Sequence, residues 1–270
     1  MNRIDQRFAE LKERGETALI PFITIGDPDV DTSVDMILEL EKAGADMVEL
    51  GVPYSDPLAD GPVIQRASRR ALSRPLTIVD CIEAARKARE AGSNLPFILF
   101  SYYNPVLQLG LERFIDLLKA NDISGMIIPD LPVEENEEIR SLGARHGIHL
   151  IPLVAPTSQA RIAQIAASAS GFVYCVSSLG VTGMRSRFHE EVDSFLQAVR
   201  AATSLPIAVG FGISNHEQFA HFAALCDGVI VGSAIVRQVE EALPLLTSEA
   251  PEDRRKGLLQ IREFVASLKG

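Results

Sequence analysis

Residues 46–62 read DMVELGVPYSDPLADGP. Aliphatic and β-branched side chains in the first half predict a buried strand, and the glycines and prolines of the second half predict a long loop. Glu49 lies inside the apolar part. Because strand side chains alternate, Met47 and Glu49 share one face, whereas Val48 and Leu50 take the other. One face of this strand therefore carries a carboxylate among apolar neighbours.

The surroundings of Glu49 indicate acid–base chemistry. A carboxylate in this position is either desolvated or lines a cavity, and both raise its pKa. A carboxylic acid with a pKa closer to neutrality can donate and accept protons. The alternative is a buried glutamate paired with a base, but residues 43–65 contain no Lys or Arg. Asp60, on the following loop, is a second carboxylate that could face the same cavity, and we take the pair as the candidate site.

The composition limits the possible classes of protein. Of the 270 residues 47% are hydrophobic, which is ordinary for a globular chain. A net charge of −10 argues against nucleic-acid binding. The widely spaced Cys81, Cys175 and Cys226 favour reduced thiols over disulfides or a zinc site. No apolar run approaches about 20 residues, and residues 1–15 lack a signal-peptide core. We expect a soluble, cytoplasmic protein that binds no membrane.

Short apolar strands alternate with helical patterns along the chain. Besides the strand that holds Glu49, we expect strands at 18–24, 96–100, 125–128, 149–154, 171–176, 207–210 and 228–231. We expect helices at 2–14, 31–43, after 62, 77–91, 111–120, 134–146, 158–168, 190–202, 215–224, after 233, and 252–268. Eight strand–helix units in this length predict one α/β domain over residues 1–270. It would be a (β/α)₈ TIM barrel with an extra N-terminal helix and a short helix after the last strand. An open doubly wound sheet is the alternative, but no Gly-x-Gly-x-x-Gly follows the first strand.

Unusual residues follow the predicted strands, at the end where barrels place their active sites. They are Glu49, Asp60, Tyr102, Asn104, Asp130, Thr182, Gly212 and Ser233. The last three of these loops, at 180–183, 210–214 and 232–234, are small and rich in backbone N–H groups. A helix that begins at Ser233 would point its positive end at the barrel mouth. In any single loop the glycines could merely make a turn, but the three together predict a phosphate site.

Other kinds of chemistry find less support in the sequence. Five acidic residues could hold Mg²⁺, yet the five histidines show no transition-metal spacing, and a site without metal is favoured. The strands after the second carry no lysine for a Schiff base. No Gly-x-Ser-x-Gly motif occurs, and the cysteines have no histidine nearby. Acid–base chemistry on a phosphate ester remains.

The chain resembles the α subunits of tryptophan synthases over its whole length. The segment from Glu49 to residue 62 is specific to that family, and the segments 21–28, 101–105, 129–135, 180–183 and 232–234 also match it. The resemblance implies a carbon–carbon lyase that cleaves indole-3-glycerol phosphate to indole and glyceraldehyde 3-phosphate in tryptophan biosynthesis. Tyr54 stands where phenylalanine is common.

The resemblance also implies roles for single residues. The residue that matches Glu49 moves protons at the indole carbon and the glycerol hydroxyl, and the one that matches Asp60 binds the indole N–H and stabilises positive charge on the ring. The implied indole pocket contains Phe22, Leu99, Tyr102, Tyr174, Thr182 and Phe211, and Thr182 lies on a loop that could close over substrate. The implied phosphate site contains Gly183, Phe211, Gly212, Gly232 and Ser233.

In that family the α subunit docks on a β subunit and passes indole to it through a tunnel in an α₂β₂ tetramer. The resemblance places residues 53–62 and 102–105 at that interface. The resemblance implies that this chain needs no cofactor and that pyridoxal phosphate belongs to the partner. Three alternatives remain: a stand-alone lyase that releases indole, a non-catalytic phosphate-binding regulator, and another phosphate-barrel isomerase.

Overall fold

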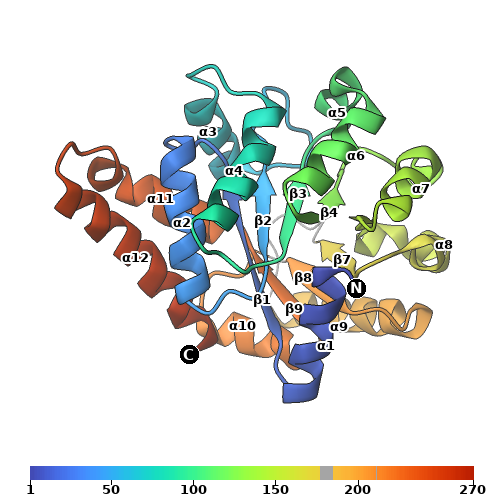
Figure 1. Cartoon of the computed structure of the whole chain (residues 1–270). Helices are drawn as coiled ribbons and strands as arrows, with labels where there is room; N and C mark the ends of the chain where they lie inside the picture. Colours follow the sequence, from blue (N-terminus) through green and yellow to red (C-terminus); the bar gives the residue numbers. More distant parts are fainter. Residues whose placement is uncertain (177–184, 211) are drawn as a thin grey trace.

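The computed structural model describes residues 1–176, 185–210 and 212–270. Its strands are all parallel and follow the order β5-β4-β3-β2-β1-β9-β8-β7-β6. They are β1 (Ala18–Thr24), β2 (Val48–Gly51), β3 (Phe97–Phe100), β4 (Ile123–Ile127), β5 (His149–Leu150), β6 (Leu153–Val154), β7 (Val173–Val176), β8 (Ile207–Gly210) and β9 (Gly228–Val231). β5 and β6 lie at the two ends of this order although they follow each other in the sequence, so the sheet curls into the predicted barrel (Figure 1).

The predicted strand at 149–154 is divided into β5 and β6. β5 pairs with β4, and β6 pairs with β7, so one segment joins the two ends of the sheet. Pro152 lies between the two pieces and has no N–H to donate to a ladder. Ile151 still donates to the Met126 carbonyl (2.9 Å), and the Pro152 carbonyl accepts from Tyr174 (3.0 Å). The (β/α)₈ barrel is therefore confirmed, with its fifth strand interrupted by a proline.

Helices surround the barrel (Figure 1). They are α1 (Arg3–Arg14), α2 (Val30–Lys42), α3 (Pro62–Ala71), α4 (Ile78–Glu90), α5 (Tyr103–Leu109), α6 (Leu111–Ala120), α7 (Glu137–Arg145), η1 (Pro156–Arg161), α8 (Ile162–Ser168), α9 (Arg185–Ala202), α10 (His216–Ala223), α11 (Ser233–Leu246) and α12 (Pro251–Lys269). α5 occupies a segment predicted as loop, because Pro105 falls in its first turn, where a missing N–H is tolerated. α11 is longer than the short helix predicted, since apolar residues continue at helical spacing to Leu246.

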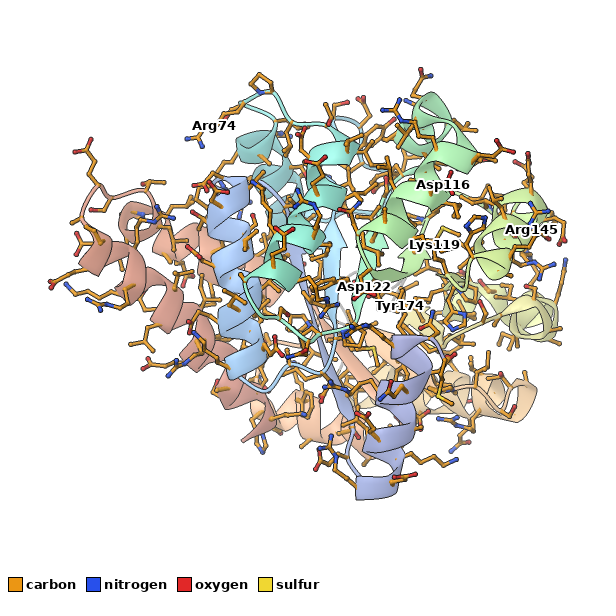
Figure 2. All side chains as sticks on the ribbon, viewed as in Figure 1. Arg74, Asp116, Lys119, Asp122, Arg145 and Tyr174 are labelled. Carbon is orange, nitrogen blue, oxygen red and sulfur yellow. The ribbon has the colours of Figure 1, made fainter. Side chains whose placement is uncertain are left out.

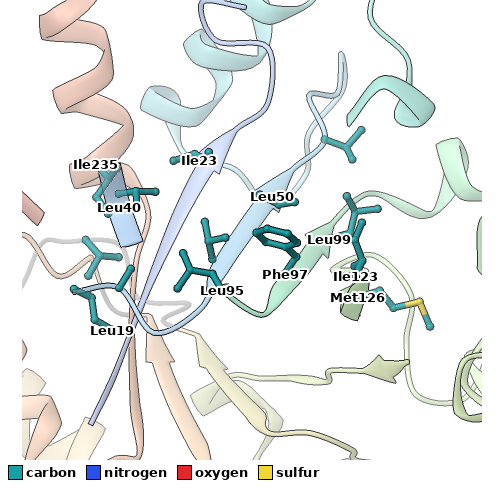
Figure 3. Close-up of a cluster of buried hydrophobic side chains, with 14 of the residues drawn as sticks. Leu19, Ile23, Leu40, Leu50, Leu95, Phe97, Leu99, Ile123, Met126 and Ile235 are labelled. Atoms are coloured by element: carbon teal, nitrogen blue, oxygen red, sulfur yellow. The ribbon is translucent and has the colours of Figure 1, made fainter. Parts of the chain in front are cut away.

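The two larger clusters of buried side chains lie inside the barrel and outside it. The inner cluster includes Ile20, Met47, Ile98, Ile127, Ile151, Phe172, Ala208 and Ile230, together with Ile4, Phe8 and Leu11 of α1. The outer cluster fills the layer between strands and helices and includes Leu50, Phe97 and Leu99 (Figure 3). α1 thus closes the amino end of the barrel, and the carboxyl ends of the strands remain for a site.

Asp46, just before β2, joins several elements at the closed end. Asp46 is 5% exposed, and its carboxylate accepts hydrogen bonds from the Leu19 N–H at 2.8 Å and from the Lys269 ammonium at 2.7 Å. Arg7 of α1 lies 3.8 Å away. One carboxylate therefore connects α1, β1 and the end of α12.

We predict that Asp46→Ala lowers the free energy of unfolding by about 2 kcal/mol, because the buried Leu19 N–H loses its acceptor. Urea denaturation measures the change. Asp31→Ala is the control: Asp31 pairs with Lys87 but its side chain is 82% exposed. That variant should stay within about 0.5 kcal/mol of the wild type. Equal effects of the two substitutions would contradict the role of Asp46.

Candidate active site

Glu49 lies on the inner face of β2 at the carboxyl end of the barrel. It pairs in register with Phe22 of β1 and Ile98 of β3, and Met47, two residues earlier, belongs to the inner cluster. Glu49 is 1% exposed. Its Oε1 has no hydrogen-bond partner among the described residues. Burial raises the pKa of Glu49 to about 8. The carboxyl group is therefore protonated near neutral pH and has a free atom for a ligand.

Two aromatic rings near Glu49 lie where glycines leave room for them. A Cβ on Gly51 would come within 2.4 Å of the Phe22 ring, and one on Gly210 within 2.6 Å of the Tyr174 hydroxyl. Tyr174 of β7 is labelled near the centre of Figure 2. Burial, and next the charge of Glu49, raise the pKa of Tyr174 well above its ordinary value. Phe22 and Tyr174 thus give the mouth of the barrel apolar walls.

Asp60 is half-buried on the loop between β2 and α3. Burial raises its pKa to about 6, and a hydrogen bond from the Tyr102 hydroxyl opposes this rise. The same hydroxyl accepts the Ala59 N–H at 2.9 Å. The Tyr102 ring stacks on Tyr54, with centroids 4.9 Å apart and planes at 23°. Tyr102, which was predicted as a pocket residue, therefore holds the Asp60 loop through its hydroxyl group. Tyr54 packs against the Tyr102 ring.

The structure does not bring Leu99 to this site. Leu99 belongs to the outer cluster, because its neighbour Ile98 pairs with Glu49 and occupies the inner face (Figure 3). By the same alternation, Phe100 faces inward, and its ring meets Phe22 edge-on at 5.6 Å. The structure thus contradicts the prediction for Leu99, and the residue that faces the barrel interior is its neighbour Phe100. Strand alternation counted from Glu49 across the pair β2–β3 would have found Phe100.

A candidate phosphate site lies at the ends of the neighbouring strands β8 and β9. Gly232 caps α11 without a side-chain hydrogen bond, so N–H groups in the first turn, from Ser233 onward, remain available. Gly212 has φ 70°, and apart from its chain neighbours no atom of the described residues lies within 4 Å of the position its Cβ would take. These are sequence-predicted phosphate residues that the structure describes. Thr182, Gly183 and Phe211 lie outside the described residues.

The structure also shows where two other residues predicted at the strand ends lie. Asn104 lies in the first turn of α5, and Asp130 accepts the Tyr103 N–H at 2.9 Å. Within residues 1–176, 185–210 and 212–270, no group of three His, Cys, Asp or Glu side chains is arranged to hold a metal ion. No helix in this described part is both long and apolar enough to cross a membrane.

We predict that Glu49→Gln stabilises the protein increasingly as the pH rises from 4.5 to 8. The unfolded chain loses the Glu49 proton near pH 4.5, whereas the folded protein keeps it to about pH 8, so the wild type loses stability across this window. At about 1.4 kcal/mol per pKa unit, several degrees of Tm difference should develop by pH 8. Differential scanning fluorimetry from pH 4.5 to 9 measures it. The exposed Glu112→Gln should show no such trend, and a constant difference for Glu49→Gln would contradict the burial.

Comparisons with known proteins agree with this geometry. The family model described as tryptophan synthase alpha chain matches residues 8–269. The tryptophan synthase alpha chain of Geobacillus sp. (strain WCH70) is 51% identical over 249 residues, which are 92% of this chain and 94% of the relative. That of Caldanaerobacter subterraneus subsp. tengcongensis is 46% identical over 269 residues, covering 100% and 99%.

A solved structure gives the same result. The crystal structure of tryptophan synthase subunit alpha from Legionella pneumophila str. Paris matches with a TM-score of 0.88 at 35% identity, covering 100% of this chain and 97% of that one. Both the sequence and the fold match over almost the full length. The chain therefore belongs to the tryptophan synthase alpha chain family.

Proposed function

We propose that Glu49 and Asp60 of this chain cleave indole-3-glycerol phosphate, the lyase reaction of the tryptophan synthase alpha family in tryptophan biosynthesis. The products are indole and glyceraldehyde 3-phosphate. One observation carries the assignment: Glu49 is a buried carboxyl group at the carboxyl end of the barrel, its pKa is about 8, and its Oε1 has no hydrogen-bond partner among the described residues. Such a group is protonated at rest and becomes a base once it has given its proton away.

The proposed reaction needs one proton to move between two atoms of the substrate. Glu49 donates its proton to the indole carbon that bears the glycerol chain, which makes the ring an indolenine cation. The resulting carboxylate then removes the proton from the hydroxyl on the adjacent chain carbon. The carbon–carbon bond breaks, its electron pair returns to the ring, and the hydroxyl carbon becomes the aldehyde. Glu49 ends protonated, as it began.

Asp60 has the complementary role in this proposal. With a pKa of about 6 it is mostly ionised near neutral pH, so its carboxylate can accept the indole N–H and stabilise the cation. Tyr102 donates to the same carboxylate and holds the backbone of Ala59, which fixes its direction. The environment thus keeps one carboxyl group neutral and the other charged.

The two ends of the substrate have separate binding regions in this proposal. Phe22, Phe100, Tyr102 and Tyr174 hold the indole ring, together with Thr182. The phosphate lies on the N-terminus of α11, against backbone N–H groups rather than arginine or lysine. Its residues are Gly183, Phe211, Gly212, Gly232 and Ser233.

A β-subunit partner follows from membership of the family, and we propose an α₂β₂ tetramer in which the partner carries pyridoxal phosphate. Two apolar side chains at the carboxyl end support this docking face. Leu58, on the Asp60 loop, is 87% exposed, and Leu107 of α5 is 49% exposed. We also propose that the protein acts in the cytoplasm, since its three cysteines are free and buried.

We predict that Glu49→Gln lowers kcat by at least about 10³-fold while ligand affinity changes little, because the amide cannot transfer the proton. Steady-state assays with indole-3-glycerol phosphate, alone and with a β subunit, measure this. The matched control Glu112→Gln should keep wild-type rates. Full activity of Glu49→Gln would contradict the proposed mechanism. Equal wild-type rates with and without the β subunit would favour a stand-alone lyase.

We predict a bell-shaped pH dependence of kcat/KM. The rate should rise through about pH 6 as Asp60 loses its proton, and fall above about pH 8 as Glu49 loses the proton that it must donate. Initial rates from pH 5 to 9.5 in buffers of constant ionic strength would give both limbs. A profile that rises continuously to pH 9.5 would show that Glu49 does not start the reaction protonated.

A further inference from the structure

Four charged side chains form a network on the outside of the mouth. Arg70 of α3 donates to both carboxylate oxygens of Asp27, each at 2.8 Å, and its third nitrogen donates to Glu240 at 2.8 Å. Arg66, one turn earlier on α3, donates to both oxygens of Glu240 at 2.8 and 2.7 Å. Two arginines and two carboxylates thus form one neutral group.

The network connects three segments that are far apart in sequence. Asp27 follows β1 and is 1% exposed. Glu240 belongs to α11, whose first turn is the candidate phosphate site. α3 follows directly on the Asp60 loop, and Gln65 in its first turn donates to the Asp60 carbonyl at 2.8 Å. The network therefore joins the helix next to Asp60 to the helix whose first turn is the candidate phosphate site, and these two helices are in contact.

Apolar packing alone would not define how α3 and α11 are aligned. Ala67 of α3, Val236 of α11 and Phe22 form a small buried cluster beneath the network. Apolar contact has no direction, so such a cluster sets the relative orientation of two helices less sharply than hydrogen bonds do. Guanidinium–carboxylate pairs with two parallel hydrogen bonds fix both distance and angle. Arg66–Glu240 and Arg70–Asp27 are two such pairs.

The charges in the network are suited to a permanent connection. Hydrogen bonds from Arg66 and then Arg70 lower the pKa of Glu240 to about 2, so Glu240 stays ionised wherever the protein is active. Burial raises the pKa of Asp27, and Arg70 acts against this rise. Removing Arg70 would leave a buried carboxylate without its partner, which endangers folding. Glu240 is the safer position to alter, because the Asp27–Arg70 pair would remain.

We propose that Arg70 and Glu240 are positioning residues that hold the Asp60 loop at a fixed distance from the phosphate-binding end of α11. The inference rests on the proposed function, in which one substrate must reach both places. Neither side chain touches the substrate. Since a displacement of about 1 Å can lower a rate about 10²-fold, a rigid connection between the two regions matters for turnover.

The test uses Glu240→Gln and three probes: indole, inorganic phosphate, and an indole joined to a phosphate by a three-carbon chain. Each half should bind the variant as it binds the wild type, because each region is intact. The joined ligand should bind about tenfold more weakly, since its advantage depends on the spacing of the two regions. Calorimetry gives the three affinities. The kcat/KM for indole-3-glycerol phosphate should fall by a similar factor or more.

Two further variants complete the experiment. Glu241→Gln alters the next residue of α11, which is exposed, and should match the wild type throughout. Arg70→Lys keeps the positive charge but loses the guanidinium group that makes two parallel hydrogen bonds to Asp27. Its kcat/KM should lie between those of the wild type and Glu240→Gln. Unchanged affinity of Glu240→Gln for the joined ligand would overturn the proposal. Parallel weakening of all three probes would also overturn it, because it would indicate general destabilisation.

The outcomes separate this inference from the proposed function. If the wild type binds the joined ligand but does not cleave indole-3-glycerol phosphate, the lyase assignment fails. The three binding affinities would still decide whether the network sets the spacing.

Discussion

Burying a carboxyl group costs free energy unless the group is neutral or paired with a base. The mouth of this barrel encloses a carboxyl group that has no partner among the described residues. Glu49 meets that condition by holding its proton to about pH 8. The walls around it follow from the same requirement: Phe22 and Tyr174 exclude water, and Gly51 and Gly210 leave space for their rings. Below Glu49, the apolar inner cluster extends to Ile4, Phe8 and Leu11 of α1. The burial of Glu49 thus has two effects: it raises the pKa into the range useful for acid–base chemistry, and it lowers the stability of the folded protein as the pH rises towards 8.

The two carboxyl groups of the site differ in surroundings rather than in chemistry. Glu49 is buried beside Phe22 and Tyr174, whereas Asp60 is half-exposed and receives a hydrogen bond from Tyr102. Their pKa values of about 8 and about 6 lie on either side of neutral pH, which separates a proton donor from an anion. The loop that carries Asp60 is held from two directions, by the Tyr102 hydroxyl and by Gln65 of α3.

The pattern of the sequence predicted the barrel well, because each parallel strand is a short apolar run followed by a helix. It also predicted the face of β2 that carries Glu49, since alternation within a strand needs no knowledge of neighbours. The predictions that failed depend on contacts between strands, which the pattern within one strand does not contain. The choice of Leu99 over Phe100 came from matching positions along the chain, whereas the register between β2 and β3 decides which one faces inward. Pro152 interrupts the predicted strand at 149–154, whereas Pro105 lies in the first turn of α5. Whether a proline ends an element or starts one depends on the residues around it. The hydrogen bonds of the Arg70 network join residues up to 174 positions apart, and no sequence pattern indicates them.

Asp46 binds Lys269 near one terminus and lies beside Arg7 near the other, so both ends of the polypeptide lie at the closed end of the barrel. The opening that would receive substrate and a second subunit faces the opposite direction. An affinity tag, a fluorescent fusion or a tether to a sensor surface could therefore be attached at residue 1 or residue 270 without shielding the opening. Immobilised protein would present its reactive face to the solution in a uniform orientation.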